Sequence, residues 1–330
     1  MSTDDLIDLD APCPISDAAP AAKAEKPKLE GDRIHVTGVD RWLECGYRAE
    51  QYRRRAWVEP LRPEASRGRA VHAAREMALK AALAGRDLPP VEACEERAHA
   101  TVHEDAKVAL DAGDEAFAAL VDAVADEARQ YARADRLGVL PDLAPHVIEV
   151  ETTIELPIEG DGLTGRYVLT GRPDAIARSP IDGRLSVPDL KTSKYAPSAA
   201  VVNTSTQHSL YSALVESKHG SRPVHSIDHV RILKTRPRAA LAPNQRLVDL
   251  GSGSAVVTKI PTDRDSADVG AALRRLRFVL DAREQGFAPP AAAAFMSSCH
   301  RCPHRGAQDS QQRCPWVPAT RAGEETESDE

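Results

Sequence analysis

The stretch YVLTGRPDAIARSPIDGRLSVPDLKTSK, residues 167–194, concentrates the chemical signal of this chain. Its apolar residues predict two strands, 168–178 and 185–192. The dipeptide Asp182-Gly183 between them is typical of a two-residue hairpin turn. The stretch therefore predicts a β-hairpin.

A hairpin closed at that turn places Asp174 opposite Lys191, and Ile176 opposite Asp189. Side chains alternate along a strand, so Asp174, Asp189 and Lys191 point to one face of the hairpin. We expect two carboxylates and an ammonium to converge there.

Two carboxylates this close repel one another unless a cation lies between them. Oxygen ligands suit a hard divalent ion, Mg²⁺ or Mn²⁺, and the ammonium of Lys191 can hold or deprotonate a water molecule. The alternative is a surface hairpin with an ordinary Asp–Lys ion pair, which contributes little to stability.

The length of 330 residues allows one large domain or two small ones, and only 4% of the residues are aromatic. No apolar run approaches the roughly 18 residues of a membrane span. The beginning, MSTDDLIDLD, is acidic and lacks the pattern of a signal peptide. We expect a cytoplasmic protein without a membrane partner.

The net charge of −7 is unevenly distributed. Residues 1–30 carry seven acidic and three basic residues, residues 319–330 carry five and one, and the remaining chain therefore has a net charge of +1. Arginines cluster at 53–55 and 274–277. Such clusters suit phosphate binding or simply form solvated faces, and both interpretations stay open.

The remaining pattern alternates between helical and strand-like segments. We expect helices at 36–55, 63–83, 91–110, 115–137, 204–218 and 267–285, and further strands at 147–156, 224–234 and 255–260. This order predicts an α/β fold with a mixed central sheet flanked by helices and a helical insertion at about 85–140. In the strand at 147–156, we expect Glu149 and Glu151 to lie on a face exposed to solvent. Alternatively, Glu151 adds a carboxylate to the metal site.

Three of the six cysteines lie in the loop-like segment CHRCPHRGAQDSQQRCP, which has little apolar surface of its own: Cys299, Cys302 and Cys314. Four thiolates hold an iron–sulfur cluster, and Cys45 is the candidate fourth ligand. Zinc with His300 or His304 is the competitor, and three reduced thiols are the third alternative. We expect Cys94 to be a small apolar residue of a helix, and Cys13 to lie in a disordered tail.

Four motifs occur in order along the chain: Gly68–His72 (G-x-x-x-H), Gly171–Asp174 (G-x-x-D), Asp189-Leu190-Lys191 (D-x-K) and Gln207–Tyr211 (Q-x-x-x-Y). Together with the split cysteine set, this order resembles the RecB-like branch of the PD-(D/E)XK nucleases. Its iron–sulfur members include CRISPR-adaptation nucleases, AddB-type nuclease domains and exonuclease V. The resemblance covers about residues 37–315.

The resemblance implies roles for individual residues. His72, Asp174, Asp189 and the Leu190 carbonyl would bind Mg²⁺ or Mn²⁺, and Lys191 would serve the water nucleophile. Gln207 and Tyr211 would orient the DNA or the lysine. Cys45, Cys299, Cys302 and Cys314 would hold a 4Fe-4S cluster.

These expectations divide the chain into a disordered acidic tail (1–30), a single nuclease domain (31–318) with a cluster-binding segment (295–318), and a second acidic tail (319–330). The implied function is metal-dependent exonuclease action on single-stranded DNA ends in repair, recombination or phage DNA metabolism, with a helicase or recombination protein as partner. Two alternatives are a DNA-binding adaptor with a non-catalytic nuclease fold and a zinc-stapled hydrolase of another phosphate ester.

Overall fold

The computed structural model of the chain describes residues 31–53, 62–111, 113–159, 165–179, 182–233 and 240–286. These residues fall into two compact units, the first within 31–36 and 62–274 and the second within 37–53 and 275–286. The predicted tails and the cluster-binding segment lie outside the described residues. Among the described helices, none combines the length and apolar character needed to span a bilayer.

The helices follow the predicted pattern with two interruptions. They are α1 (Val36–Glu44), α2 (Gly46–Arg53), α3 (Pro63–Leu83), α4 (Val91–Asp111), α5 (Glu115–Ala118), α6 (Val121–Gly138), α7 (Leu140–Leu143), the 3-10 turn η1 (Ala144–His146), α8 (Ala199–Asn203), α9 (Thr206–His219) and α10 (Ser266–Glu284). The predicted helix at 36–55 breaks at Cys45, directly before Gly46, a residue that weakens helix interiors. The helix predicted at 115–137 is divided into α5 and α6 by a turn.

The strands of the first unit form two sheets. They are β1 (Asp32–His35), β2 (Val147–Val150), β3 (Ile154–Pro157), β4 (Tyr167–Gly171), β5 (Ala175–Arg178), β6 (Leu185–Thr192), β7 (Val224–Leu233), β8 (Gln245–Asp249) and β9 (Ser254–Thr262). One sheet has the order β1-β4-β3 and the other β2-β5-β6-β7-β9-β8. The β6–β7 pair is parallel and the other pairs of the larger sheet are antiparallel. The expected mixed α/β architecture is confirmed.

The predicted hairpin differs from the observed one in two respects. The segment predicted as one strand, 168–178, is divided between β4 in the smaller sheet and β5 in the larger. Pro173 lies at the division, and its lack of an N–H group interrupts a strand ladder.

The register of the hairpin is the second difference. Ala177 pairs with Ser186 and Arg178 with Leu185, so the pairing is shifted by two residues from the predicted one. The loop is longer than a two-residue turn: Ser179 N donates to Arg184 O, and Gly183, with φ of +70°, donates back to Ser179 O. A shift of two preserves the alternation of side chains between the two sheet faces.

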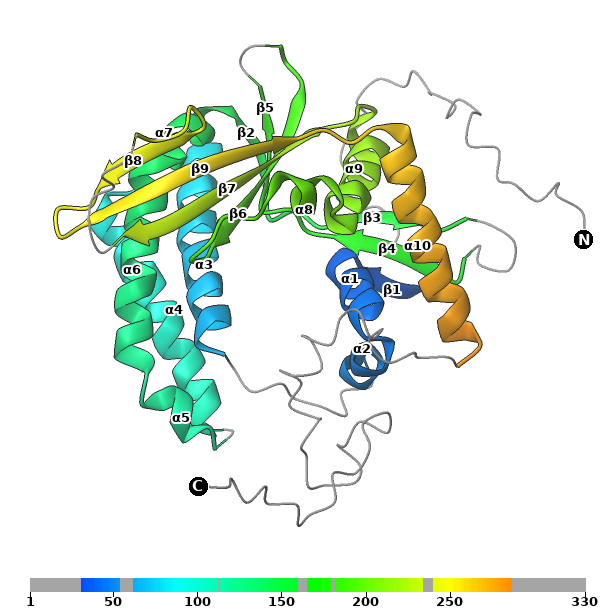
Figure 1. The fold of residues 1–330 in the computed structure, drawn as a ribbon, viewed down its shortest axis with the longest axis horizontal. Helices are drawn as coiled ribbons and strands as arrows, with labels where there is room; N and C mark the ends of the chain where they lie inside the picture. The colour runs from blue at the N-terminus through cyan, green and yellow to red at the C-terminus, as the bar shows by residue number, and fades with distance from the viewer. Residues whose placement is uncertain are drawn as a thin grey trace, which may run out of the picture. The chain divides into compact units, whose positions relative to one another are not determined.

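Two long helices, α3 and α6, pack against the larger sheet, and a third, α4, packs against both of these helices (Figure 1). Their contact faces are rich in alanine, including the fully buried Ala70, Ala98 and Ala128. Small side chains let helix axes approach closely, which suits this three-helix layer. Cys94 is buried in the same core, as predicted, and burial raises the pKa of its thiol to about 11.

A buried ionic triad ties two of these helices to the sheet. Arg75 on α3 lies 2.6 Å from Asp135 on α6 and 3.4 Å from Asp228 on β7, and all three side chains are at most 5% exposed. The pKa of Arg75 is raised, because the attraction of the two carboxylates outweighs the burial of the guanidinium. The pKa of Asp228 is also raised, because its burial outweighs the attraction of Arg75.

The second unit brings α1 and α2 against the end of α10. The Trp42 and Phe278 rings meet edge to face with centroids 5.8 Å apart, and Arg283 Nε lies 3.2 Å from Glu50 Oε1. Cys45, which lies between α1 and α2, is partly exposed in this unit.

Candidate active site

Residues from α3, β2, β5 and β6 meet in the first unit at the point where β5 begins. Asp174 precedes β5, and its Oδ2 atom lies 3.2 Å from His72 Nδ1 of α3. The same oxygen accepts a hydrogen bond of 3.2 Å from the backbone N–H of Leu190 in β6. The structure thus places the predicted histidine, carboxylate and D-x-K strand together.

Glu151, directly after β2, completes a cluster with these residues. One ligand atom from each of His72, Glu151 and Asp174 lies within 4.8 Å of the other two. Glu151 adopts φ of +49°, a conformation that L-residues other than glycine rarely adopt. The solvated face predicted for this residue is therefore wrong, since its carboxylate turns into the site and is only 12% exposed.

The electrostatics of the cluster favour a bound cation. Burial and the neighbouring carboxylate of Asp174 raise the pKa of Glu151 to about 6, although Arg172 Nε lies 2.6 Å from it. Burial lowers the pKa of His72, but the attraction of Asp174 outweighs that effect and the net shift is upward. One imidazole and two carboxylates form a donor set that suits Mn²⁺ or Mg²⁺, with water as further ligands.

Asp189 and Lys191, two residues apart on β6, form a tight ion pair. Lys191 Nζ lies 2.8 Å from Oδ2 and 3.1 Å from Oδ1 of Asp189. The pKa of Asp189 is lowered, because Lys191 and His208 outweigh its burial, and the pKa of Lys191 is raised by the same pairing. The described side-chain contacts of Asp189 are therefore with Lys191 and His208, and its predicted role as a metal ligand stays a prediction.

His208 is a contact that the sequence analysis missed. Its Nε2 atom lies 3.7 Å from Asp189 Oδ2, and its side chain is 4% exposed. The residue follows Gln207 at the start of α9, and its ring lies 5.4 Å from that of His225 on β7. Helical spacing could have indicated a buried histidine here, but no local pattern links it to β6.

Gln207 and Tyr211 lie on one face of α9, as the spacing predicts. Tyr211 donates a hydrogen bond of 3.3 Å to the Arg172 carbonyl, and the side chain of Gln207 acts on the Tyr211 hydroxyl to lower its pKa. Burial and the carboxylate of Asp174 raise the pKa of Tyr211 to about 12. Tyr211 therefore anchors the turn that carries Asp174.

The glycine of the G-x-x-D motif has a packing reason. A Cβ atom at Gly171 would lie 2.5 Å from Leu214 Cδ1 and 2.8 Å from Tyr211 Cε1, both far below van der Waals contact. Gly68 of the G-x-x-x-H motif differs, because a Cβ atom there meets nothing within 4 Å. Packing within the described chain thus explains the first glycine but not the second.

Gly171→Ala is expected to displace Tyr211 and Leu214, lower the free energy of unfolding by about 1–3 kcal/mol, and reduce the activity of the site. Urea denaturation followed by circular dichroism, with an activity assay beside it, measures both effects. Gly68→Ala is the matched control and should be neutral or slightly stabilising, since alanine is favoured in helix interiors. Equal stability of Gly171→Ala and the parent would contradict the packing argument.

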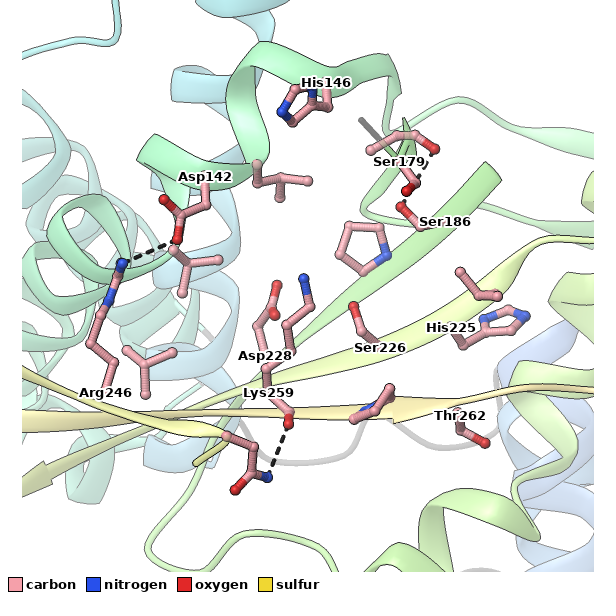
Figure 2. Close-up of a pocket in the computed structure, with 18 of the residues that line it drawn as sticks. Asp142, His146, Ser179, Ser186, His225, Ser226, Asp228, Arg246, Lys259 and Thr262 are labelled. Carbon is pink, nitrogen blue, oxygen red and sulfur yellow. Dashed lines mark hydrogen bonds and ion pairs between the residues drawn. The ribbon is translucent and has the colours of Figure 1, made fainter. Parts of the chain in front are cut away.

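A separate cavity of about 950 Å³ lies toward the other end of the sheet (Figure 2). Asp142 and Arg246 form an ion pair at its rim, and Ser226 and Asp228 line it along β7. Pro188 of β6 lines it too, on the sheet face opposite to Asp189. Its described lining includes none of the candidate catalytic residues.

Of the predicted cluster ligands, only Cys45 is described. It is partly exposed between α1 and α2. Cys299, Cys302 and Cys314 lie outside the described residues, as do the alternative zinc ligands His300 and His304.

Comparisons with known proteins place these residues in a wider context. Among solved structures, the chain resembles a "putative exonuclease" from Eubacterium rectale, with 11% identity, a TM-score of 0.46, and coverage of 82% of this chain and 88% of that one. It also resembles a structure named SSO0001, with 12% identity, a TM-score of 0.34, and coverage of 84% and 89%. No curated protein matches the chain.

The model of one protein family, the PD-(D/E)XK nuclease superfamily, matches residues 33–307. This range includes the described residues of the site and most of the chain. The chain therefore belongs to the PD-(D/E)XK nuclease superfamily.

Proposed function

We propose that the protein is a metal-dependent DNA exonuclease acting at single-stranded ends. The observation that carries this proposal is the convergence of His72, Glu151 and Asp174 beside the Asp189–Lys191 pair. The family membership supports hydrolysis of phosphodiester bonds as the reaction.

Each residue has a distinct role in the proposed reaction. His72, Glu151 and Asp174 would hold one divalent ion, which supplies positive charge to the scissile phosphate. Lys191, charged because of its contact with Asp189, would orient the attacking water and offset charge that develops on the phosphate. His208, whose Nε2 atom lies 3.7 Å from Asp189 Oδ2, would hold the Asp189 carboxylate in position.

An exposed aromatic residue supports a single-stranded substrate. Tyr195 lies four residues after Lys191 and is 71% exposed, and Lys194 Nζ lies 5.3 Å from the centre of its ring. Bases of single strands stack on such rings, and a neighbouring ammonium suits the phosphate backbone. Paired bases offer no free face for this contact, so the substrate we propose is unpaired DNA.

End-labelled linear single strands, linear duplexes and circular single strands, each with Mg²⁺, Mn²⁺ or a chelator, test this proposal. Linear single strands should be shortened from an end with either ion, while circles stay intact and the chelator stops the reaction. Cleavage of circles at the rate of linear strands would contradict exonuclease action, and no cleavage of any DNA would contradict the proposed function.

Tyr195→Ala should raise KM for linear single strands about tenfold, the loss of roughly one stacked base, with a smaller change in kcat. Tyr195→Phe keeps the ring and should retain the KM of the parent. A KM of Tyr195→Ala equal to that of the parent would remove base stacking from the substrate argument.

The cysteines support a second element of the proposal, a 4Fe-4S cluster held by Cys45, Cys299, Cys302 and Cys314. The packing of Trp42 on Phe278 brings the helices around Cys45 to α10, and α10 ends at Glu284, fifteen residues before Cys299. A tie from Cys45 closes a segment of about 250 residues, and such long closures remove much entropy from the unfolded chain.

Cys45→Ala is expected to lose iron and to lower Tm, because binding of a structural metal adds to folding free energy. Iron and sulfide content and the visible spectrum of anaerobically purified protein measure this, and Cys94→Ser serves as the control for iron content. Stoichiometric zinc without iron in the parent would favour a zinc site with His300 or His304. Full iron in Cys45→Ala would exclude Cys45 from the ligands.

A further inference from the structure

Two histidines on α4 form a pair that the proposed nuclease reaction does not use. His99 and His103 lie one helical turn apart, and their Nε2 atoms are 3.1 Å from each other. Their ring centroids are 4.3 Å apart with an angle of 43° between the planes. Both rings are partly exposed, so a solute can reach the two nitrogens.

The distance between the two nitrogens suits two ligands of one metal ion. Zinc–imidazole bonds are about 2.0–2.1 Å long, so two such ligands at angles between about 90° and 109° have nitrogens about 2.9–3.3 Å apart. The spacing H-x-x-x-H places two imidazoles on one helix face, as in helical zinc sites. The segment here, HATVH, has alanine where zinc proteases carry their glutamate, so the pair has ligands without a catalytic base.

A third ligand comes from the facing helix. Asp122, in the first turn of α6, has its Oδ1 atom 4.0 Å from His103 Nε2, and its side chain is 89% exposed. The Asp122 carboxylate is exposed, so its side chain is free to change rotamer toward the two imidazoles. Water would complete the coordination, since the pair opens to solvent.

Charged groups on α6 surround the histidine pair. Arg129 carries a positive charge, which would repel a bound cation, but it lies 3.6 Å from the carboxylate of Asp126 on the same helix. Burial and Arg129 lower the pKa of His99, which favours the neutral imidazole that binds metals. The carboxylates of Asp126 and Asp122 raise the pKa of His99 and place negative charge beside the site.

We propose that His99, His103 and Asp122 bind one transition-metal ion of the class that prefers imidazole, such as Zn²⁺, and thereby join α4 to α6. This site is distinct from the nuclease centre, because α4 and α6 carry none of the candidate catalytic residues. Its role is structural, since it links α4 to α6, and α6 packs on the larger sheet. The competing explanation is a hydrogen bond between two neutral rings, which needs no metal.

The test is a Zn²⁺ titration of metal-stripped full-length protein by calorimetry, with Asp174→Ala as the background to weaken the nuclease site. The double variant His99→Ala/His103→Ala should bind one equivalent fewer than the background. His146→Ala removes another histidine and should retain the full number, so it controls for a general loss of imidazole. Thiol sites contribute equally to all these proteins and cancel in the difference.

A second readout distinguishes the site from a hydrogen bond. Zn²⁺ should raise the Tm of the background more than that of the double variant, because an ion that binds only the folded state stabilises it. Asp122→Asn should bind the ion more weakly without removing it. An equal Zn²⁺ stoichiometry and an equal Tm shift in the double variant would overturn the proposal.

Nuclease activity separates this proposal from the previous one. In the otherwise unchanged protein, His99→Ala/His103→Ala should cleave DNA at the parental rate while having lost its one zinc equivalent. If the parent has no nuclease activity but the zinc difference persists, the proposed function fails and the α4–α6 metal site stands. Should the double variant fold poorly, judged by circular dichroism, His99→Gln/His103→Gln gives the same comparison with polar side chains.

Discussion

Lys191→Ala and Asp174→Ala are each expected to slow DNA hydrolysis by about two to four orders of magnitude. The ammonium of Lys191 is held beside Asp189 at 2.8 Å, and Asp174 contacts both His72 and the Leu190 backbone. Neither side chain has a substitute among the described residues of the site. DNA binding should persist, because the substitutions leave the surrounding basic and aromatic side chains in place.

Single-turnover cleavage of end-labelled DNA at saturating protein concentration measures this loss separately from binding. Two controls match the two variants: Lys194→Ala removes a neighbouring lysine, and Asp182→Ala removes an exposed carboxylate from the same hairpin. Both should retain hydrolysis rates within a few-fold of the parent at saturation. Cleavage by Lys191→Ala at the parental rate would contradict the assignment of this residue.

Arg75→Met is expected to destabilise the protein by about 3–5 kcal/mol, because it leaves two buried carboxylates without their cation. Asp135 and Asp228 are 2% and 5% exposed, so water cannot replace the guanidinium fully. The loss should appear as a lower midpoint in urea denaturation with a similar m-value.

A matched control lies on the same helix. Lys80 pairs with Glu76 four residues earlier on the exposed face of α3, and Lys80→Met should cost only about 0.3–0.5 kcal/mol. The triple variant Arg75→Met/Asp135→Asn/Asp228→Asn removes all three charges and should recover part of the stability. A stability of Arg75→Met within 1 kcal/mol of the parent (roughly the error of such a prediction) would show that the triad is dispensable.

Local rules were sufficient for much of the candidate site. Strand alternation placed Asp189 and Lys191 on one sheet face, and helical spacing placed Gln207 and Tyr211 on one face of α9. Both results follow from backbone geometry and hold without knowledge of the neighbouring elements. The two-residue register shift left the first of them intact, since side chains repeat every second residue.

The sequence by itself thus determined the α/β class, most helix ranges, and the pairing of side chains within single elements, because these depend on periods of 2 and 3.6 residues. Only the tertiary structure decided which distant groups meet. Glu151, whose φ is positive, lies beside His72. His208 of α9 contacts Asp189 of β6, and Arg75 of α3 contacts Asp135 of α6 and Asp228 of β7. Such contacts depend on how helices and strands pack, and no local pattern in the sequence encodes that.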